Sequence, residues 1–205
     1  ALISAAVALV AAIVAFDSQL GVSGDNCEFI VLARSLWSGQ GLSYINMPEP
    51  VVSVKFPPGF ILMLAPLSSS IMAMKILVVG LFVCTASLLG WKFGIWAGLA
   101  TALNPLLLLY SSQIMSEIPY TALSVGALIL LPHHFALGLL LASYASLTRS
   151  VGLVLLIAIA MAEKGRRRWW AATAAVVTYG GWAIRGKLSG NTVNLGYFKQ
   201  LLLAD

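Results

Sequence analysis

Residues 71–90 read IMAMKILVVGLFVCTASLLG, and this run decides the class of fold. A transmembrane helix needs about 20 predominantly apolar residues, so the run predicts a helix that crosses a membrane. The composition agrees, because 60% of the chain is hydrophobic and 9% is charged, with a mean hydropathy of +0.95. Soluble domains average about 25% charged residues. The chain is therefore predicted to be an integral membrane protein.

Further apolar segments lie on both sides of this run. The first begins at Ala1 and is interpreted as a helix clipped at its start; the later ones are expected at roughly 93–110, 117–131, 134–148, 151–163 and 168–184. The alternation typical of a membrane barrel is absent, so helices must satisfy the backbone within lipid. The prediction is an all-α polytopic protein with about seven transmembrane helices in a module spanning residues 1–184. Residues 185–205 are expected to lie outside and to begin a further C-terminal region.

The basic residues predict the orientation, because Lys and Arg gather in cytoplasmic loops. The strongest signal is EKGRRR, from Glu163 to Arg168. Counting helices from it places the N-terminus, Lys92 and the His133–His134 turn in the cytoplasm as well. Residues 17–70 then form a long first external loop. The net charge of +5 is interpreted as a topology signal, and no nucleic-acid partner is expected.

The external loop contains the stretch DNCEFIVLARSLWSGQG, from Asp25 to Gly41. An apolar stripe with helical spacing predicts an amphipathic helix at the outer membrane interface, apolar face toward lipid. The stripe consists of Phe29, Ile30, Ala33, Leu36 and Trp37. Gly39 and Gly41 follow as a C-terminal stop. Asp25 and Glu28 also have the spacing of a capping box, and a capped carboxylate can still face a cleft.

A second motif, KFPPGF, runs from Lys55 to Phe60. Prolines fix φ and disfavour helix before them, so the chain is expected to arrive extended and then begin a short apolar segment. Gly59 is expected to permit a tight turn. This geometry would hold Lys55 at the membrane surface.

Together the two motifs resemble the first external loop of the GT-C glycosyltransferases, which use polyprenyl-phosphate-linked sugars. Examples are the protein O-mannosyltransferases and the lipid A aminoarabinose transferases. The positions that match the family pattern are Asp25, the aromatic Phe29, the pair Ala33–Arg34, Leu36 in place of Met, and Lys55 with Pro57–Pro58, spaced by Phe56. The resemblance covers the first loop strongly and the transmembrane segments in pattern.

The resemblance implies transfer of a sugar from a polyprenyl-phosphate donor to a lipid, glycan or protein acceptor on the external face of the cell's inner or plasma membrane. It assigns the general base to Asp25, because a carboxylate at the interface can take the acceptor's proton. The leaving phosphate needs cations, and Lys55 and Arg149 are the external cations nearest the boundary. Arg149 is costly to place there without an anionic partner; the alternative is that it snorkels to the interface.

Three further residues are candidates for substrate binding, namely Glu117, Glu28 and Arg34. Glu117 can be interpreted as an acid at a helix N-terminus, as an acceptor contact or as a metal ligand. Asn26 stands where the family often has a second acid, so no metal ligand or cofactor is assigned, and a divalent metal stays an open alternative.

The alternative function is a non-catalytic scaffold subunit of a membrane complex. A transporter is disfavoured, because the sequence shows no internal repeat. Membrane lipids are expected around the chain in either case.

Overall fold

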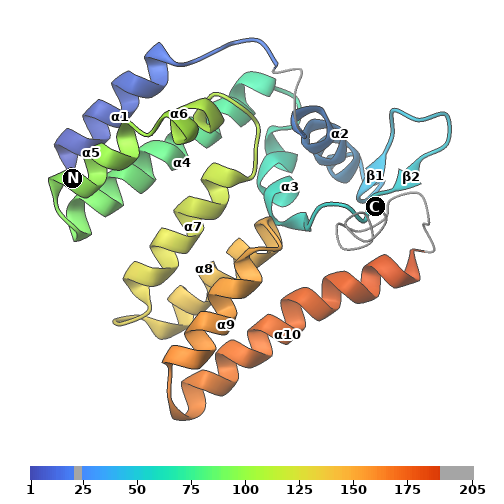
Figure 1. The fold of residues 1–205 in the computed structure, drawn as a ribbon. Coiled ribbons are helices and arrows are strands. Elements are labelled where there is room, and N and C mark those ends of the chain that lie inside the picture. The colour runs from blue at the N-terminus through green and yellow to red at the C-terminus, as the bar shows by residue number, and fades with distance from the viewer. Residues whose placement is uncertain (21–24, 190–205) are drawn as a thin grey trace, which may run out of the picture.

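The computed structural model describes residues 1–20 and 25–189, which are mostly helical with very little strand (Figure 1). This confirms the predicted all-α class. In chain order the helices are α1 Leu2–Val14, α2 Asn26–Trp37, α3 Pro58–Leu64, α4 Ile71–Lys92, α5 Ile95–Ala102, α6 Pro105–Ser111, α7 Glu117–Leu130, α8 Phe135–Thr148, α9 Gly152–Ala162 and α10 Gly165–Leu188, with a 3₁₀ turn at Ala65–Leu67.

Two short strands, which the sequence analysis did not predict, form a hairpin in the loop between α2 and α3. β1 (Ser43–Tyr44) pairs antiparallel with β2 (Val51–Val52), so that Tyr44 lies opposite Val51. Ser53 N continues the pairing by donating to Leu42 O at 2.8 Å. The hairpin holds residues that are distant in sequence beside α2.

Apolar side chains gather in two clusters. The first joins α1, α2, α3 and α4, and its largest fully buried members include Phe60 and Phe82. The second joins α7, α8, α9 and α10 around Ala142 and Leu156. Helix α7 packs against both α4 and α8, so it connects the two clusters.

Four expected segments coincide with helices to within two residues. They are 71–90 with α4, 117–131 with α7, 134–148 with α8 and 151–163 with α9. Within residues 1–20 and 25–189, α4 is the one helix that is long and apolar enough by itself to cross a membrane. Helices α1, α7, α8 and α9 are apolar and shorter.

The sequence predicted one segment at 93–110. The structure divides it into two helices, α5 and α6. Asn104 Oδ1 accepts hydrogen bonds from Leu106 N at 3.0 Å and Leu107 N at 3.1 Å. Because Pro105 has no N–H and its fixed φ suits the first helical position, a new helix begins there.

Helix α10 also differs from the expected segment 168–184, because it begins at Gly165 and continues to Leu188. The boundary expected between residues 184 and 185 therefore falls inside a helix. Residues 190–205, the rest of the expected external segment, lie outside the described residues, as do residues 21–24.

Most of the apolar stripe of α2 packs on the protein, which corrects the expectation that this face points toward lipid. The Phe29 ring lies 4.6 Å from Phe56 and 5.0 Å from Phe60, centroid to centroid, and Phe29 is 2% exposed. The aromatic partners supplied by the KFPPGF motif bury this face. Trp37, at the end of the stripe, is exposed.

Gly59 lies inside α3 and not in a tight turn, so that expectation was wrong. Pro57 is extended, with φ −60° and ψ 149°, as the prolines predicted. A Cβ on Gly59 would lie 2.7 Å from the backbone carbon of Leu147, and Tyr144 Oη donates to Gly59 O at 2.9 Å. Close contact between α3 and α8 explains the glycine. This contact between α3 and α8 places the segment that leads into α3 near the ends of α7, α8 and α9 (Figure 1).

Candidate active site

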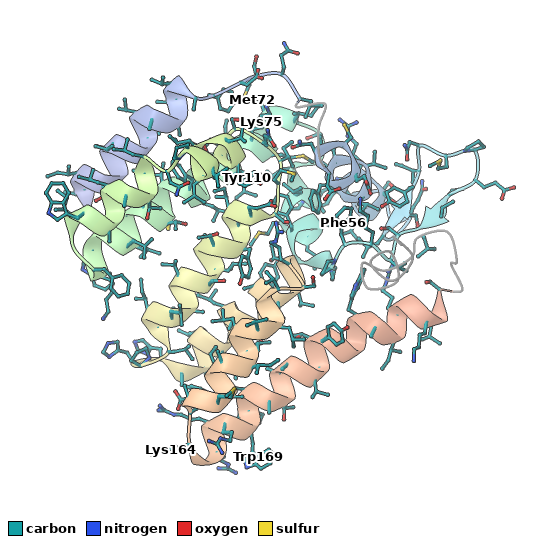
Figure 2. The ribbon with its side chains drawn as sticks, viewed as in Figure 1. Phe56, Met72, Lys75, Tyr110, Lys164 and Trp169 are labelled. Carbon is teal, nitrogen blue, oxygen red and sulfur yellow. The ribbon has the colours of Figure 1, made fainter. Side chains whose placement is uncertain are left out.

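A cavity of about 210 Å³ lies where α2 and the Pro57 segment meet the ends of α7 and α8. Phe56, labelled in Figure 2, marks this end of the molecule. The cavity is lined by Asp25, Phe56, Pro57, Met115, Ser116, Glu117, Thr148, Arg149 and Ser150. Three residues selected from the sequence, Asp25, Glu117 and Arg149, are thus brought together from three separate segments.

Lys55 joins this group through Asp25. Its Nζ lies 2.9 Å from Asp25 Oδ1 and 2.7 Å from Glu28 Oε1, and 4.6 Å from the centroid of the Phe56 ring. Burial by itself lowers the pKa of Lys55, but its hydrogen bonds to Glu28 and Asp25 outweigh burial and raise the pKa above its usual value. The ammonium therefore stays charged at neutral pH.

The capping-box interpretation of Asp25 and Glu28 is wrong. Asp25 occupies the N-cap position of α2, yet among the described residues its side chain accepts no capping hydrogen bond from the helix. Both acids point to Lys55 instead. A charged donor forms stronger hydrogen bonds than a backbone N–H, which explains why the lysine prevails.

A chain of hydrogen bonds holds Glu28 in place. Tyr44 Oη donates to Glu28 Oε2 at 2.5 Å, and Ser53 Oγ donates to Tyr44 Oη at 3.3 Å. Burial, followed by the bond to Glu28, raises the pKa of Tyr44 to about 12. Arg185 Nη1 of α10 donates to Ser53 O at 2.7 Å. The sequence analysis missed these supporting residues, because it did not predict the hairpin that aligns them.

Arg149 has the anionic partner that its position demands. It forms an ion pair with Glu117 and donates from Nη1 to Ser116 Oγ at 3.4 Å. Glu117 begins α7 and Arg149 follows α8, so the antiparallel helix pair brings them to the same end. Glu117 Oε2 is buried and has no hydrogen-bond partner in the described part of the chain. Such an unpaired acceptor is costly, so it is available to a hydroxyl or cation that binds in the cavity.

Asn26 and Arg34 have structural partners outside the cavity. Asn26 is buried, and its Oδ1 accepts from Ile114 N at 2.8 Å, which fastens α2 to the segment before α7. Arg34 Nε donates to Ser68 O at 3.2 Å, and Arg34 does not line the cavity. The structure therefore brings Asp25, Lys55, Glu28, Glu117 and Arg149 together, and leaves Arg34 aside.

Within residues 1–20 and 25–189, no three His, Cys, Asp or Glu side chains gather in a way that could hold a metal ion. Comparison of the chain with protein-family models, with curated proteins and with solved structures gave no match. The functional interpretation therefore depends on the loop motifs and on the geometry of this cavity.

Proposed function

We propose that this chain is a membrane glycosyltransferase of the GT-C type. It moves a sugar from a polyprenyl-phosphate donor to an acceptor on the external face of the membrane. The observation that carries the proposal is the meeting of Asp25, Glu117 and Arg149 around one cavity, with Lys55 held on Asp25. These are the residue types that the transfer needs, and the loop motifs select two of them, Asp25 and Lys55.

In the proposed reaction, an acceptor oxygen attacks the anomeric carbon of the sugar. A new carbon–oxygen bond forms, the bond to the phosphate oxygen breaks, and the electron pair leaves with the polyprenyl phosphate. Asp25 takes the acceptor's proton as general base. Lys55 and Arg149 stabilise the charge that builds up on the departing phosphate.

The ion pairs suggest how donor binding activates the base. In the structure, Lys55 contacts the Asp25 carboxylate and Arg149 contacts Glu117. A phosphate that enters the cavity competes for both cations. When Lys55 moves to the phosphate, the Asp25 carboxylate loses its ion-pair partner, so it is free to accept a proton when the donor is in place.

The cavity also limits which part of the donor it can hold. Its volume of about 210 Å³ is below the range of about 300–1,000 Å³ usual for small-molecule sites. We assign it the reacting end of the donor, and the polyprenyl chain lies outside it.

The proposed membrane topology has seven crossings, with the cytoplasmic N-terminus in α1 and the cavity facing outside. Helix α4 meets the length and hydropathy of a crossing, and the apolar character of α1, α7, α8 and α9 supports the others. Helices α5 and α6 together form one crossing interrupted at Asn104, and α10 forms the last. Labelling of single cysteines tests this, since a cysteine at Glu49 should react with an impermeant reagent from outside the cell.

The activity is tested with labelled polyprenyl-phosphate hexoses and pentoses added to native membranes that contain the overexpressed chain. We expect one donor to be consumed, with its label appearing in an acceptor, and we expect Asp25→Asn to stop this. Asp17→Asn is the matched control, because Asp17 is exposed and does not line the cavity. If every donor is left unbound and unconsumed, the proposal is wrong.

One observation favours the scaffold alternative. Both cations at the cavity are already paired with carboxylates, and such pairs also occur as structural clamps. A scaffold subunit would bind none of the donors and would keep its partners after Asp25→Asn. The donor assay therefore separates the two functions.

A further inference from the structure

A groove between α9 and α10 shares no lining residue with the candidate active site. Its volume is about 710 Å³, within the range of ligand sites. Trp169, labelled in Figure 2 near Lys164, lines the groove close to the α9–α10 turn. The groove follows α9, whose 11 residues correspond to a length of about 16 Å. It is therefore an elongated, mostly apolar groove on the surface of the two helices.

The walls of the groove expose large hydrophobic side chains. Ile157 and Met161 of α9 are 45% and 75% exposed, and Trp169 and Val176 of α10 are 71% and 71% exposed. Contiguous exposed apolar surface usually marks a binding site or a contact with membrane. The groove thus suits a hydrocarbon chain.

One end of the groove is strongly basic. Arg168 lines the groove, and Lys164, Arg166 and Arg167 adjoin it in the segment EKGRRR, where Glu163 is the single acid. Arg168 Nε donates to Glu163 O at 3.2 Å, and Arg167 Nη1 lies 4.0 Å from Glu163 Oε2. One carboxylate cannot neutralise four cations, so this end retains positive charge that can attract an anion.

We infer that the α9–α10 groove binds one anionic phospholipid. Its phosphate lies beside Arg168, and one acyl chain runs along Ile157, Ala160 and Val176. The positive charge at one end favours an anionic lipid as the ligand. A lipid without net charge or an apolar protein helix would contact the apolar side chains and would leave the basic end without a counter-charge. Basic pockets beside membrane helices bind anionic headgroups in this way. The inference requires that the chain lies in a membrane and does not rest on the transferase activity.

The purified chain in detergent, titrated with dioleoyl phosphatidylglycerol or dioleoyl phosphatidylcholine and examined by native mass spectrometry, tests the inference. We expect phosphatidylglycerol to bind at least about fivefold more tightly, and Arg168→Gln to weaken it about fivefold. Lys92→Gln is the control, because Lys92 is exposed on another helix and does not line the groove. Sugar transfer plays no part in the readout, so either proposal can fail without the other.

Ala172→Trp tests the apolar part, because Ala172 lines the groove and an indole there would fill it. It should weaken binding of both lipids; if thermal unfolding shows that this variant is misfolded, Ala160→Leu replaces it. The inference is overturned if the two lipids bind equally, if Arg168→Gln binds like the wild type, or if the folded groove variant binds normally. It is also overturned if the chain forms a dimer that excludes lipid, since a second copy would then occupy the groove.

Discussion

Among the residues that the structure describes, two lysines are buried or partly buried, and their ammonium groups are held in different ways. Lys75 lies in α4 (Figure 2), is 1% exposed, and donates to Asp17 O at 2.5 Å and to Gln19 O at 2.6 Å. Lys55 lies in the loop before α3, its side chain is 21% exposed, and it contacts the carboxylates of Asp25 and Glu28. Each ammonium also lies over a phenylalanine ring, so the aromatic contact does not distinguish them.

The difference lies in what the partners can do. The partners of Lys75 are backbone carbonyls, which cannot turn away without moving the chain between α1 and α2. The partners of Lys55 are carboxylate side chains, and Asp25, which lines the cavity, can rotate away when a competing anion arrives. Lys75 is therefore a tether between α4 and the segment after α1, whereas Lys55 is suited to exchange one anion for another.

The largest expected effect is that of Asp25→Asn on sugar transfer. The amide keeps the size of the side chain and cannot take a proton, so we expect a loss of at least about 10²–10⁴-fold, the usual contribution of a general base. Donor binding should be kept or become tighter, because the neutral amide competes less with the phosphate for Lys55. Initial rates with labelled donor measure the effect, with Asp17→Asn as the control.

An Asp25→Asn variant that retains its rate would remove Asp25 from the chemistry. The search for a base would then move to Glu28, Glu49 or Glu117. Of these, Glu117 would come first, because it lines the cavity and its Oε2 lacks a hydrogen-bond partner among the described residues.

The next effect concerns stability and the other lysine. Lys75→Met removes the charged donor of two carbonyls, and a hydrogen bond from a charged group contributes about 1.5–3 kcal/mol. We therefore expect a free energy of unfolding lower by roughly 2 kcal/mol, with donor binding unchanged. Lys92→Met, at the exposed end of the same helix, is the control for thermal unfolding. If Lys75→Met and Lys92→Met have the same unfolding temperature, then the hydrogen bonds of Lys75 to the segment after α1 do not stabilise the fold.

Gly59→Ala should disturb the contact that positions Lys55. The added Cβ would lie 2.7 Å from the Leu147 backbone, and overpacking of this kind costs about 1–3 kcal/mol. We expect a lower unfolding temperature and weaker donor binding. Gly80→Ala in α4 is the control, because, apart from the adjacent backbone of α4 itself, no described atom would lie within 4 Å of its Cβ. Equal unfolding temperatures for the two variants would contradict the close packing of α3 on α8.

The smallest expected effect is a dependence of the unfolding temperature on pH, caused by Lys55 and by Tyr44 beside it. The folded-state pKa values of Tyr44, about 12, and of Lys55 both lie above the ordinary values of about 10 and 10.4. Their contribution to stability is therefore complete below pH 10 and is lost as the pH rises through the folded-state values. We expect the unfolding temperature to fall between pH 10 and pH 12, and to fall less in Tyr44→Phe. If the unfolding temperature falls equally with pH in the wild type and in Tyr44→Phe, the result would argue against the hydrogen-bond network of Tyr44, Glu28 and Lys55.

Much of the framework could be predicted because apolar runs and their spacing are local signals. The positions of α4, α7, α8 and α9 follow from them, and so does the shared location of Glu117 and Arg149, since antiparallel neighbours return to the same end. The proline pair predicted the extended backbone at Pro57.

The missed features depend on contacts between distant segments. The capping interpretation of Asp25 was wrong because Lys55, 30 residues away, supplies a stronger partner. The role of Gly59 depends on the backbone of α8, and the hairpin has too few residues to show a pattern. Lys75 did offer a signal, because a lysine inside an apolar segment requires a partner. Its partners are backbone carbonyls, which have no sequence signature.

The most direct test of the central claim is the binding of polyprenyl phosphate, without a sugar, to the purified chain. The account predicts that the phosphate binds more tightly than the corresponding polyprenol, and that Lys55→Ala and Arg149→Ala each weaken it about 10- to 100-fold, as expected for charge-assisted hydrogen bonds of about 1.5–3 kcal/mol. Lys92→Ala should bind like the wild type. Equal affinities for the phosphate and the alcohol, with no effect of Lys55→Ala, would contradict the claim that these cations exchange their carboxylates for a lipid phosphate.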